Sequence, residues 1–255
     1  MTDVKAETAS VTTHTSEVPV DRAREGVGGL HTAVRQWILD GTLKPGASLS
    51  QVELSQRLGV SRTPLREVLR MLQEEGLVIA ETNLRVRVAD FDPQTLDADY
   101  ACRILLESLA LDLTVPGLTG ADCETLATML DTMAGAAAGS DVTSWFATHA
   151  EFHGILTRGA SPALRKELRT YADRSIRYIR VVQHSEPDAW QAPGDREHRT
   201  IVEAITAGDA LQARSVLAHH LARTALRALT DLAPQFEPVA VRRALAMATD
   251  SAPLR

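Results

Sequence analysis

Four histidines in the C-terminal half of the chain have spacings that can gather their side chains around a metal ion. His149 and His153 are four residues apart, so both side chains project from one face of a single helix. His198 shares a helical stripe with apolar residues three, four and seven positions later, which points it inward. His220 lies one turn after an apolar residue, whereas the adjacent His219 falls nearer the polar side. Four imidazoles from three helices can therefore converge inside a bundle.

This set of imidazoles leaves three chemical interpretations open. Imidazole nitrogens suit Zn²⁺, Ni²⁺ or another borderline divalent metal. The same residues can instead line a metal-free polar pocket, since single histidines are common in cores and on surfaces. A metal-bound water would make the protein a hydrolase. However, the one nearby candidate base, Glu151, lies between His149 and His153 without the HExxH spacing. The sequence therefore favours a binding protein over an enzyme.

The elements that must position these histidines are helices. From residue 94 onward the apolar residues follow a helical period, with no convincing strand. The predicted helices are 94–114, 121–138, 141–158, 162–184, 195–207 and 209–231, with glycines and prolines between them. A short helix is expected around 239–247. Arg174, Arg177 and Arg180 form a basic cluster on the 162–184 helix, of which one or two can face the interior. The pattern predicts an all-α bundle of about six helices.

A second set of residues with binding chemistry lies near the N-terminus. Residues 48–75 predict two short helices joined by a tight turn at Gly59. Ser61 is placed to cap the second helix. The apolar stripe of that helix, at i, i+3, i+4 and i+7, consists of Leu65, Val68, Leu69 and Leu72. The residues left on its outer face are Arg62, Thr63, Arg66 and Arg70. Such a basic helix on a small core can enter a DNA major groove.

An ordinary solvated charged face is the alternative interpretation of this helix. Three features favour DNA binding instead. The outer face carries arginines rather than a mixture of lysine and glutamate, and the preceding helix is short. The following stretches, 77–79 and 84–88, read as two strands around a polar turn, which together form a wing. The region therefore predicts a winged helix-turn-helix.

Composition agrees with a two-domain binding protein. The 255-residue chain has a formal net charge of −6. Residues 22–88 contain 10 Lys and Arg against 7 Asp and Glu, so they carry +3, and the remainder carries −9. Cys102 and Cys123 sit in helical apolar patterns, which predicts reduced thiols. No apolar run approaches the roughly 20 residues that span a bilayer, and no signal pattern precedes the first helix. We therefore expect a cytoplasmic protein without a membrane partner.

These observations predict a mainly α protein with five segments. They are a disordered tail (1–22), a winged helix-turn-helix domain (23–90), a linker (91–95), an all-helical domain (96–232) and a C-terminal extension (233–255). The linker contains the proline of FDPQT, which ends the wing.

The N-terminal domain resembles the DNA-binding domain of GntR-family transcription regulators. The matching pieces are VRQWILDG, LKPG and SRTPLREVL, the last being the most specific. The resemblance implies that Arg62 and Arg66 contact base edges or adjacent phosphates, and that Ser61 and Thr63 hold the phosphate backbone. Val52 stands where many relatives have arginine. Arg85 stands where most have the wing-tip glycine, and together with Arg87 it is expected to reach the minor groove or the backbone.

The helical region resembles the C-terminal ligand-binding domain of the FadR subfamily, the FCD domain. The matching pieces are RILLE, HAEFHGIL, EHRTIVEAITAGD and the His-Leu pair at 220–221. In metal-binding members one Asp and three His hold the ion, and their positions fall on His149, His153, His198 and His220. The acidic ligand is thus replaced by His149, which keeps a ligand but removes a negative charge. Ser161 stands where relatives often have Asn.

The resemblance also implies an effector and an assembly. Arg103 matches an arginine that faces the ligand pocket, where it would clamp a carboxylate bidentately. An ion pair of Arg103 with Glu107 or Asp99, each four residues away, is the alternative. The function expected from the resemblance is a transcription repressor that binds a palindromic operator as a homodimer. A small organic acid would control this DNA binding.

Overall fold

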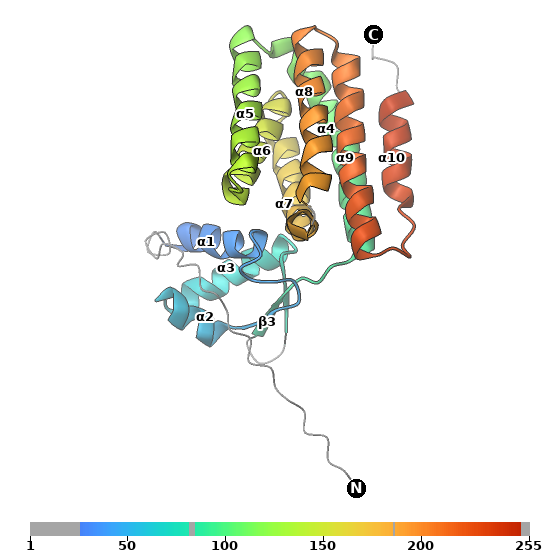
Figure 1. The fold of residues 1–255 in the computed structure, drawn as a ribbon. Coiled ribbons are helices and arrows are strands. Elements are labelled where there is room, and N and C mark those ends of the chain that lie inside the picture. The colour runs from blue at the N-terminus through green and yellow to red at the C-terminus, as the bar shows by residue number, and fades with distance from the viewer. Residues whose placement is uncertain (1–25, 82–84, 186, 251–255) are drawn as a thin grey trace.

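The computed structural model describes residues 26–81, 85–185 and 187–250. The small N-terminal domain lies at one end of a larger bundle of helices (Figure 1). The prediction of a mainly α fold with a small β wing and a helical bundle is confirmed. The predicted tail, 1–22, lies outside the described residues.

The N-terminal domain combines three helices with a three-stranded sheet. In chain order its elements are α1 (Val27–Leu39), β1 (Ser48–Ser50), α2 (Gln51–Leu58), α3 (Arg62–Glu74), β2 (Val78–Ala80) and β3 (Arg85–Val88). The sheet order is β1-β3-β2, with both neighbouring pairs antiparallel. The sequence predicted the two wing strands but not β1, because three residues between turns carry no usable period. β1 joins the sheet through Leu49 opposite Val86.

Local sequence signals start and stop the helices of this domain. Ser50 caps α2 by accepting a hydrogen bond from the amide of Glu53. Gly59 and Gly76 follow α2 and α3 with φ of 64° and 72°, the left-handed conformation that glycine adopts without steric cost. The predicted stripe of α3 is buried in the domain core, with Leu65, Val68 and Leu72 each 0% exposed. Because this stripe faces the core of the domain, the opposite face of α3 is exposed.

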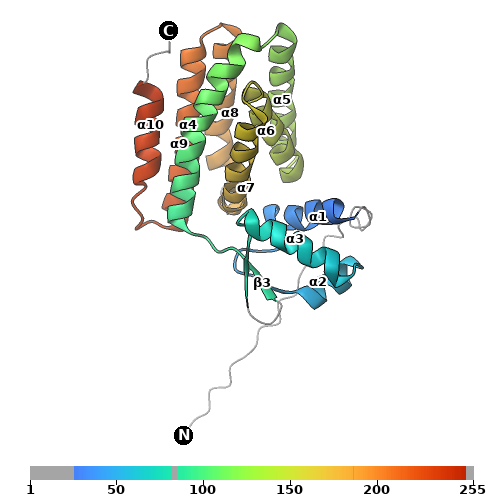
Figure 2. The same cartoon turned by 180° about the vertical axis from the view of Figure 1, so that it is seen from behind.

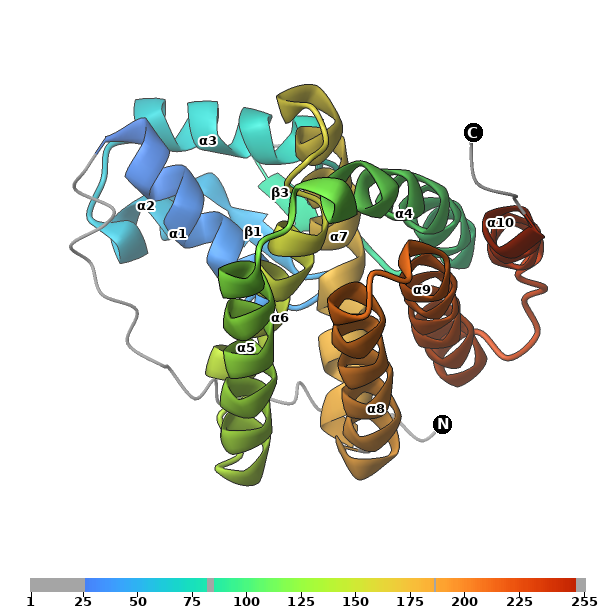
Figure 3. The same ribbon diagram turned by 90° about the horizontal axis from the view of Figure 1, so that it is seen from above.

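The C-terminal domain is a bundle of helices around one apolar core. Its helices are α4 (Pro93–Thr114), α5 (Gly120–Ala138), α6 (Val142–Leu156), α7 (Pro162–Ser185), α8 (Pro187–Thr206), α9 (Ala210–Leu232) and α10 (Val239–Asp250), with a short 3₁₀ turn, η2 (Val115–Gly117), after α4. Viewed from above, α8, α9 and α4 lie beside one another, with α6 and α7 between α4 and α5 (Figure 3). None of the helices in the described part of the chain is long and apolar enough to cross a membrane.

Two boundaries differ from the prediction. α4 begins at Pro93, inside the predicted linker 91–95, because Asp92 accepts hydrogen bonds from the amides of Gln94 and Thr95. α8 begins at Pro187 rather than at 195 and continues through Pro193. Proline at the first helical position is compatible with a helix. An internal proline loses one ladder hydrogen bond and its ring crowds the preceding turn, a cost that packing of the helix in the bundle can offset. Reading Pro193 as a helix breaker was therefore wrong.

Within the predicted C-terminal extension, 233–255, residues 239–250 form a helix of the bundle. α10 lies against α4 and α9 (Figure 2) and buries Val241, Ala244 and Ala248 in the main core. The buried carboxylate of Asp97 on α4 accepts hydrogen bonds of 3.0 and 2.9 Å from the amides of Ala240 and Val241. These bonds satisfy donors at the start of α10, which have no partner within the helix. α10 therefore belongs to the helical domain.

The two domains are joined by polar contacts between α7 and the N-terminal domain. The hydroxyl of Tyr178 donates to the carbonyl of Asp90 at 2.5 Å, and Arg177 donates to the carbonyl of Leu77 at 3.4 Å. Arg35 on α1 pairs with Asp173 on α7. Ile176 packs against the apolar cores of both domains. α7 is therefore the helix through which the bundle contacts the winged domain.

Candidate functional site

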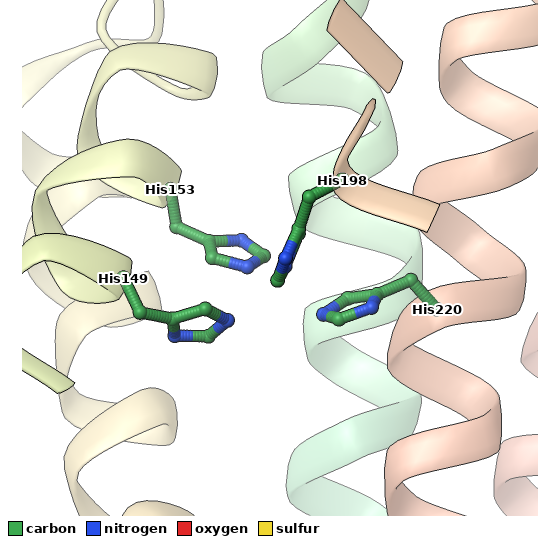
Figure 4. A group of neighbouring side chains, drawn as sticks. All are labelled: His149, His153, His198 and His220. Carbon is green, nitrogen blue, oxygen red and sulfur yellow. The ribbon is translucent and has the colours of Figure 1, made fainter. Parts of the chain in front are cut away.

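The four histidines of the bundle converge in its interior. His149 and His153 come from α6, His198 from α8 and His220 from α9. Figure 4 shows the side chains of the two α6 histidines pointing toward those of the other two. One potential ligand atom from each residue lies within 4.8 Å of the others. His198 and His220 are almost fully buried, at 0% and 5% exposed. His219, by contrast, is exposed and contacts the carbonyl of Ser215 on its own helix.

His153 contacts a glutamate, which in turn pairs with an arginine. Nδ1 of His153 lies 3.1 Å from Oε2 of Glu107, and Nε of Arg103 donates to Oε1 of the same carboxylate at 2.7 Å. Burial raises the pKa of Glu107, but Arg103 and His153 together outweigh it and lower that pKa to about 2. Glu107 is therefore ionised at neutral pH and fixes the orientation of His153.

The same arrangement recurs behind His220. Nδ1 of His220 lies 2.8 Å from Oε2 of Glu197, which also accepts two hydrogen bonds from Arg223 at 2.6 and 2.7 Å. Burial raises the pKa of Glu197, and its bonds to His220 and Arg223 lower it to about 2. A carboxylate on Nδ1 selects the tautomer whose Nε2 is free to bind a metal. Two Arg–Glu–His arrays therefore face each other across the site.

The remaining imidazole nitrogens lack hydrogen-bond partners among the described residues. Nε2 of His153 and both ring nitrogens of His198 are buried without one. Buried polar nitrogens are normally paired, and binding of an ion or a water is a recognised reason for exceptions. The imidazoles converge, some of their nitrogens are free, and carboxylates lie at the other ring nitrogen of His153 and of His220. This arrangement fits a tetrahedral or open divalent metal site. The residues present thus fit a borderline metal ion.

Burial favours the neutral form of three of these imidazoles, those of His149, His198 and His220. Desolvation, followed by the neighbouring histidines, lowers the pKa of His149 and of His198 well below the ordinary value. Desolvation is also the main reason that the pKa of His220 falls to about 4, although Glu197 opposes it. Neutral imidazole is the form that binds metals. His149, His198 and His220 are therefore in their ligating protonation state at neutral pH.

These lowered pKa values predict a pH dependence of stability. Between about pH 4 and 6.5 the unfolded metal-free chain binds protons at these histidines, whereas the folded chain does not. The free energy of unfolding should therefore fall as the pH is lowered through this range. Urea unfolding of chelator-treated protein at several pH values measures this. His219→Gln should leave the profile unchanged, and equal stability at pH 7 and pH 5 would refute the prediction.

A cavity of about 410 Å³ opens beside the histidines. Helices α4, α6, α7, α8 and α9 line it, and α1 of the winged domain contributes Arg35, Gln36 and Leu39. Trp145 on its wall stacks on His149 with ring centroids 4.7 Å apart. The volume lies in the range of small-molecule sites. A ligand of metabolite size at the histidines would therefore also be close to the DNA-binding domain.

The arginines predicted near this pocket have different surroundings. Arg103 lines the cavity and pairs with Glu107, so the predicted ion pair is present. Asp99 pairs instead with Arg174. Arg177 is at the domain junction. Within the basic cluster of α7, Arg180 is the residue that lines the cavity. Sequence reasoning missed Glu197 and Arg223, although Glu197 directly precedes His198.

The outer face of α3 presents the predicted DNA-contacting residues. Arg62, Thr63 and Arg66 are exposed, with no hydrogen bond or ion pair to other described residues. Arg70 on the same helix is paired with Glu67 at 2.8 Å and with Glu74. Ser61 occupies the N-cap position in an extended conformation, but its side chain makes no capping hydrogen bond. The hydroxyl of Ser61, which is exposed, therefore does not pair with the first-turn amides of α3.

The predicted wing arginines differ in their partners. Arg85 is exposed, and its Nη1 donates a hydrogen bond of 3.4 Å to the hydroxyl of Ser48. Arg87 is paired with Glu81 at 3.0 Å and with Asp90. A phosphate contact by Arg87 would have to replace these carboxylates, whereas Arg85 is free to turn toward DNA. Residues 82–84, between the two wing strands, lie outside the described ranges. Val52, at the position of the missing arginine, is exposed on α2.

A winged helix-turn-helix attached to a helical ligand-binding bundle defines a class of transcription regulators. Comparison with protein families gives the same result for each domain. Residues 29–88 match the bacterial regulatory proteins of the gntR family, and residues 99–223 match the FCD domain. The chain belongs to the GntR family of transcription regulators, which are not enzymes.

Several known proteins are similar to most of the chain. An HTH-type regulator from an unstable DNA locus of Streptomyces ambofaciens is 30% identical over 207 residues, 79% of this chain and 82% of its own. A probable D-xylose utilization operon transcriptional repressor of Paenarthrobacter nicotinovorans is 29% identical over 72% of this chain and 80% of its own. The solved structure of E. coli McbR/YncC shares the fold, with a TM-score of 0.73, 22% identity, and coverage of 80% of this chain and 97% of that one.

Proposed function

We propose that this chain is a cytoplasmic, homodimeric repressor of the FadR subfamily, controlled by a small organic acid that binds beside a divalent metal. The convergence of four imidazoles at a cavity that also touches α1 carries the proposal. The similarity to a protein described as a probable transcriptional repressor supports the direction of control.

DNA would be read by α3. Arg62 and Arg66 would contact base edges or adjacent phosphates, because a guanidinium can bridge guanine O6 and N7. Ser61 and Thr63 would hold phosphates, for which hydroxyls and a helix N-terminus are suited. Arg85 and Arg87 would reach the minor groove or the backbone from the wing. Two copies of α3 in a dimer would read a palindromic operator.

The metal would be held by His149, His153, His198 and His220. Zn²⁺ or Ni²⁺ is favoured, since imidazoles match borderline ions better than hard ones. The metal would supply Lewis acidity toward a carboxylate oxygen of the effector. With His149 in place of an acidic ligand, the site contributes no negative charge of its own through its four ligands. An anionic effector would therefore be attracted more strongly.

A metal-free pocket is less well supported by the arrangement of the site. Without an ion, both nitrogens of His198 and Nε2 of His153 stay buried without a partner among the described residues. Leaving such groups unpaired costs about 1–3 kcal/mol each.

The carboxylates that a hydrolase would need are also occupied, because Glu107 and Glu197 bind arginines, and Glu151 is exposed.

Control of DNA binding by the effector is a matter of linked equilibria. If the acid favours one arrangement of the two domains and DNA favours another, each ligand must weaken the binding of the other by the same factor. The contacts of α7 with α1 and with the carbonyls of Leu77 and Asp90 are where that rearrangement would occur.

DNase I protection by the purified full-length protein on the promoter region of its own gene tests the proposal. We expect two protected half-sites related by a dyad and spaced by about one helical turn, roughly 34 Å, or a multiple of it. The protection should be relieved by an organic acid. Absence of sequence-specific protection on any fragment near the gene would overturn the proposed function.

A further inference from the structure

The cavity contains a cationic group outside the histidine site. Arg180 on α7 lines the cavity and lies with its guanidinium carbon 4.3 Å from the ring centroid of Phe146. Phe146 contacts Trp145, which in turn stacks on His149. A series of side-chain contacts through Phe146 and Trp145 therefore links Arg180 to His149.

Arg180 differs from the other buried arginines of the cavity in its partners. Arg103 and Arg223 are bound to Glu107 and Glu197, and both belong to the arrays behind the histidines. Nε of Arg180 is buried and has no hydrogen-bond partner in the described ranges. Nε1 of Trp145, another residue of the cavity wall, is likewise buried and unpaired. Unpaired donors on a cavity wall indicate an occupant that brings hydrogen-bond acceptors.

The electrostatic surroundings of Arg180 favour an anion. Burial lowers the pKa of Arg180, and Asp40 at the end of α1 opposes this shift. Arginine nevertheless stays protonated in proteins, so Arg180 places on the cavity wall a positive charge that is only partly neutralised. A carboxylate there would gain a charge-assisted hydrogen bond in a partly desolvated site.

We propose that Arg180 is a second anion-binding residue of this cavity, and that the effector carries two anionic groups, as a dicarboxylate does. One group would bind at the histidine centre and the other at Arg180. This inference rests on the proposed function, since it requires an acid to bind at the histidines. Its second group would then lie beside Asp40 and the α1 residues that line the cavity, Arg35, Gln36 and Leu39.

Calorimetric titration of the full-length, zinc-loaded protein with matched acids tests the inference. The probes are monocarboxylates and α,ω-dicarboxylates of equal carbon number, from propionate and malonate to hexanoate and adipate. In at least one pair the dicarboxylate should bind roughly tenfold more tightly or better. Arg180→Gln should abolish this preference and leave monocarboxylate binding and zinc content unchanged. Arg180→Lys should retain part of it.

Arg169→Gln is the matched control, because Arg169 lies on the same helix at the exposed rim of the cavity. It should keep the preference. Thermal unfolding of each variant shows whether it is folded, and Arg180→Lys preserves the test if the glutamine variant is not. Equal binding of mono- and dicarboxylates by the wild type, or an unchanged preference in Arg180→Gln, would overturn the role of Arg180 while the acid site stands. Binding of no acid at all would overturn the proposed function as well.

Discussion

Arg66→Ala is expected to abolish operator binding while leaving metal and effector binding intact. Arg66 is exposed on α3, and the interaction described for its side chain is a minor electrostatic one with Glu67, so its loss should cost the fold little. A bidentate arginine–guanine contact contributes about 1–3 kcal/mol of discrimination, and a dimer loses two of them. The expected loss of affinity is therefore on the order of a hundredfold or more. Electrophoretic mobility shift with the gene's own promoter fragment measures it.

Arg70→Ala is the matched control for this substitution. Arg70 lies one turn further along α3 and is equally exposed, but Glu67 and Glu74 already bind its guanidinium. Its removal should weaken operator binding far less than removal of Arg66. Equal losses in the two variants would mean that α3 contributes only general positive charge. Loss of both DNA and metal binding in Arg66→Ala would mean that the residue serves folding.

Glu107→Ala is expected to destabilise the protein strongly and to weaken metal binding. The substitution leaves Arg103, which is 7% exposed, without its carboxylate and removes the partner of His153. Breaking a buried ion pair by removing one partner costs about 3–5 kcal/mol. Loss of a carboxylate behind a ligating histidine costs about 10–100-fold in metal affinity. Urea unfolding of the metal-free protein and competition with a zinc chelator measure the two effects separately.

Glu151→Ala provides the comparison, because Glu151 lies on α6 between His149 and His153 but is exposed. Its removal should change the free energy of unfolding by less than about 0.5 kcal/mol and leave zinc affinity unchanged. If Glu107→Ala is as stable as Glu151→Ala, the buried Arg103–Glu107–His153 array does not have the structural role assigned to it.

The features that could be predicted from the sequence follow a regular period. Leu65, Val68 and Leu72 mark the inner face of α3 and thereby expose Arg62 and Arg66. The four histidines could be predicted to converge in the same way, because each shares a stripe with buried apolar residues. Helical periodicity reports which side chains point inward, and in a bundle that is enough to bring them together.

The features that could not be predicted depend on contacts between distant segments. The sequence left open whether Arg103 pairs with Glu107 or Asp99, and Arg174 on α7 decides this by binding Asp99. The packing of α10 depends on Asp97, more than 140 residues earlier in the chain. The approach of α1 to the cavity follows from how the domains meet, which no local pattern encodes.

The metal content of the protein tests the central claim most directly. Untagged full-length protein would be incubated with Zn²⁺, freed of excess ion by gel filtration and subjected to elemental analysis, beside a His198→Ala variant. Four converging imidazoles predict about one ion per chain in the wild type and none in the variant. A wild-type protein that retains no zinc, or a variant that retains as much as the wild type, would contradict a metal site at these histidines.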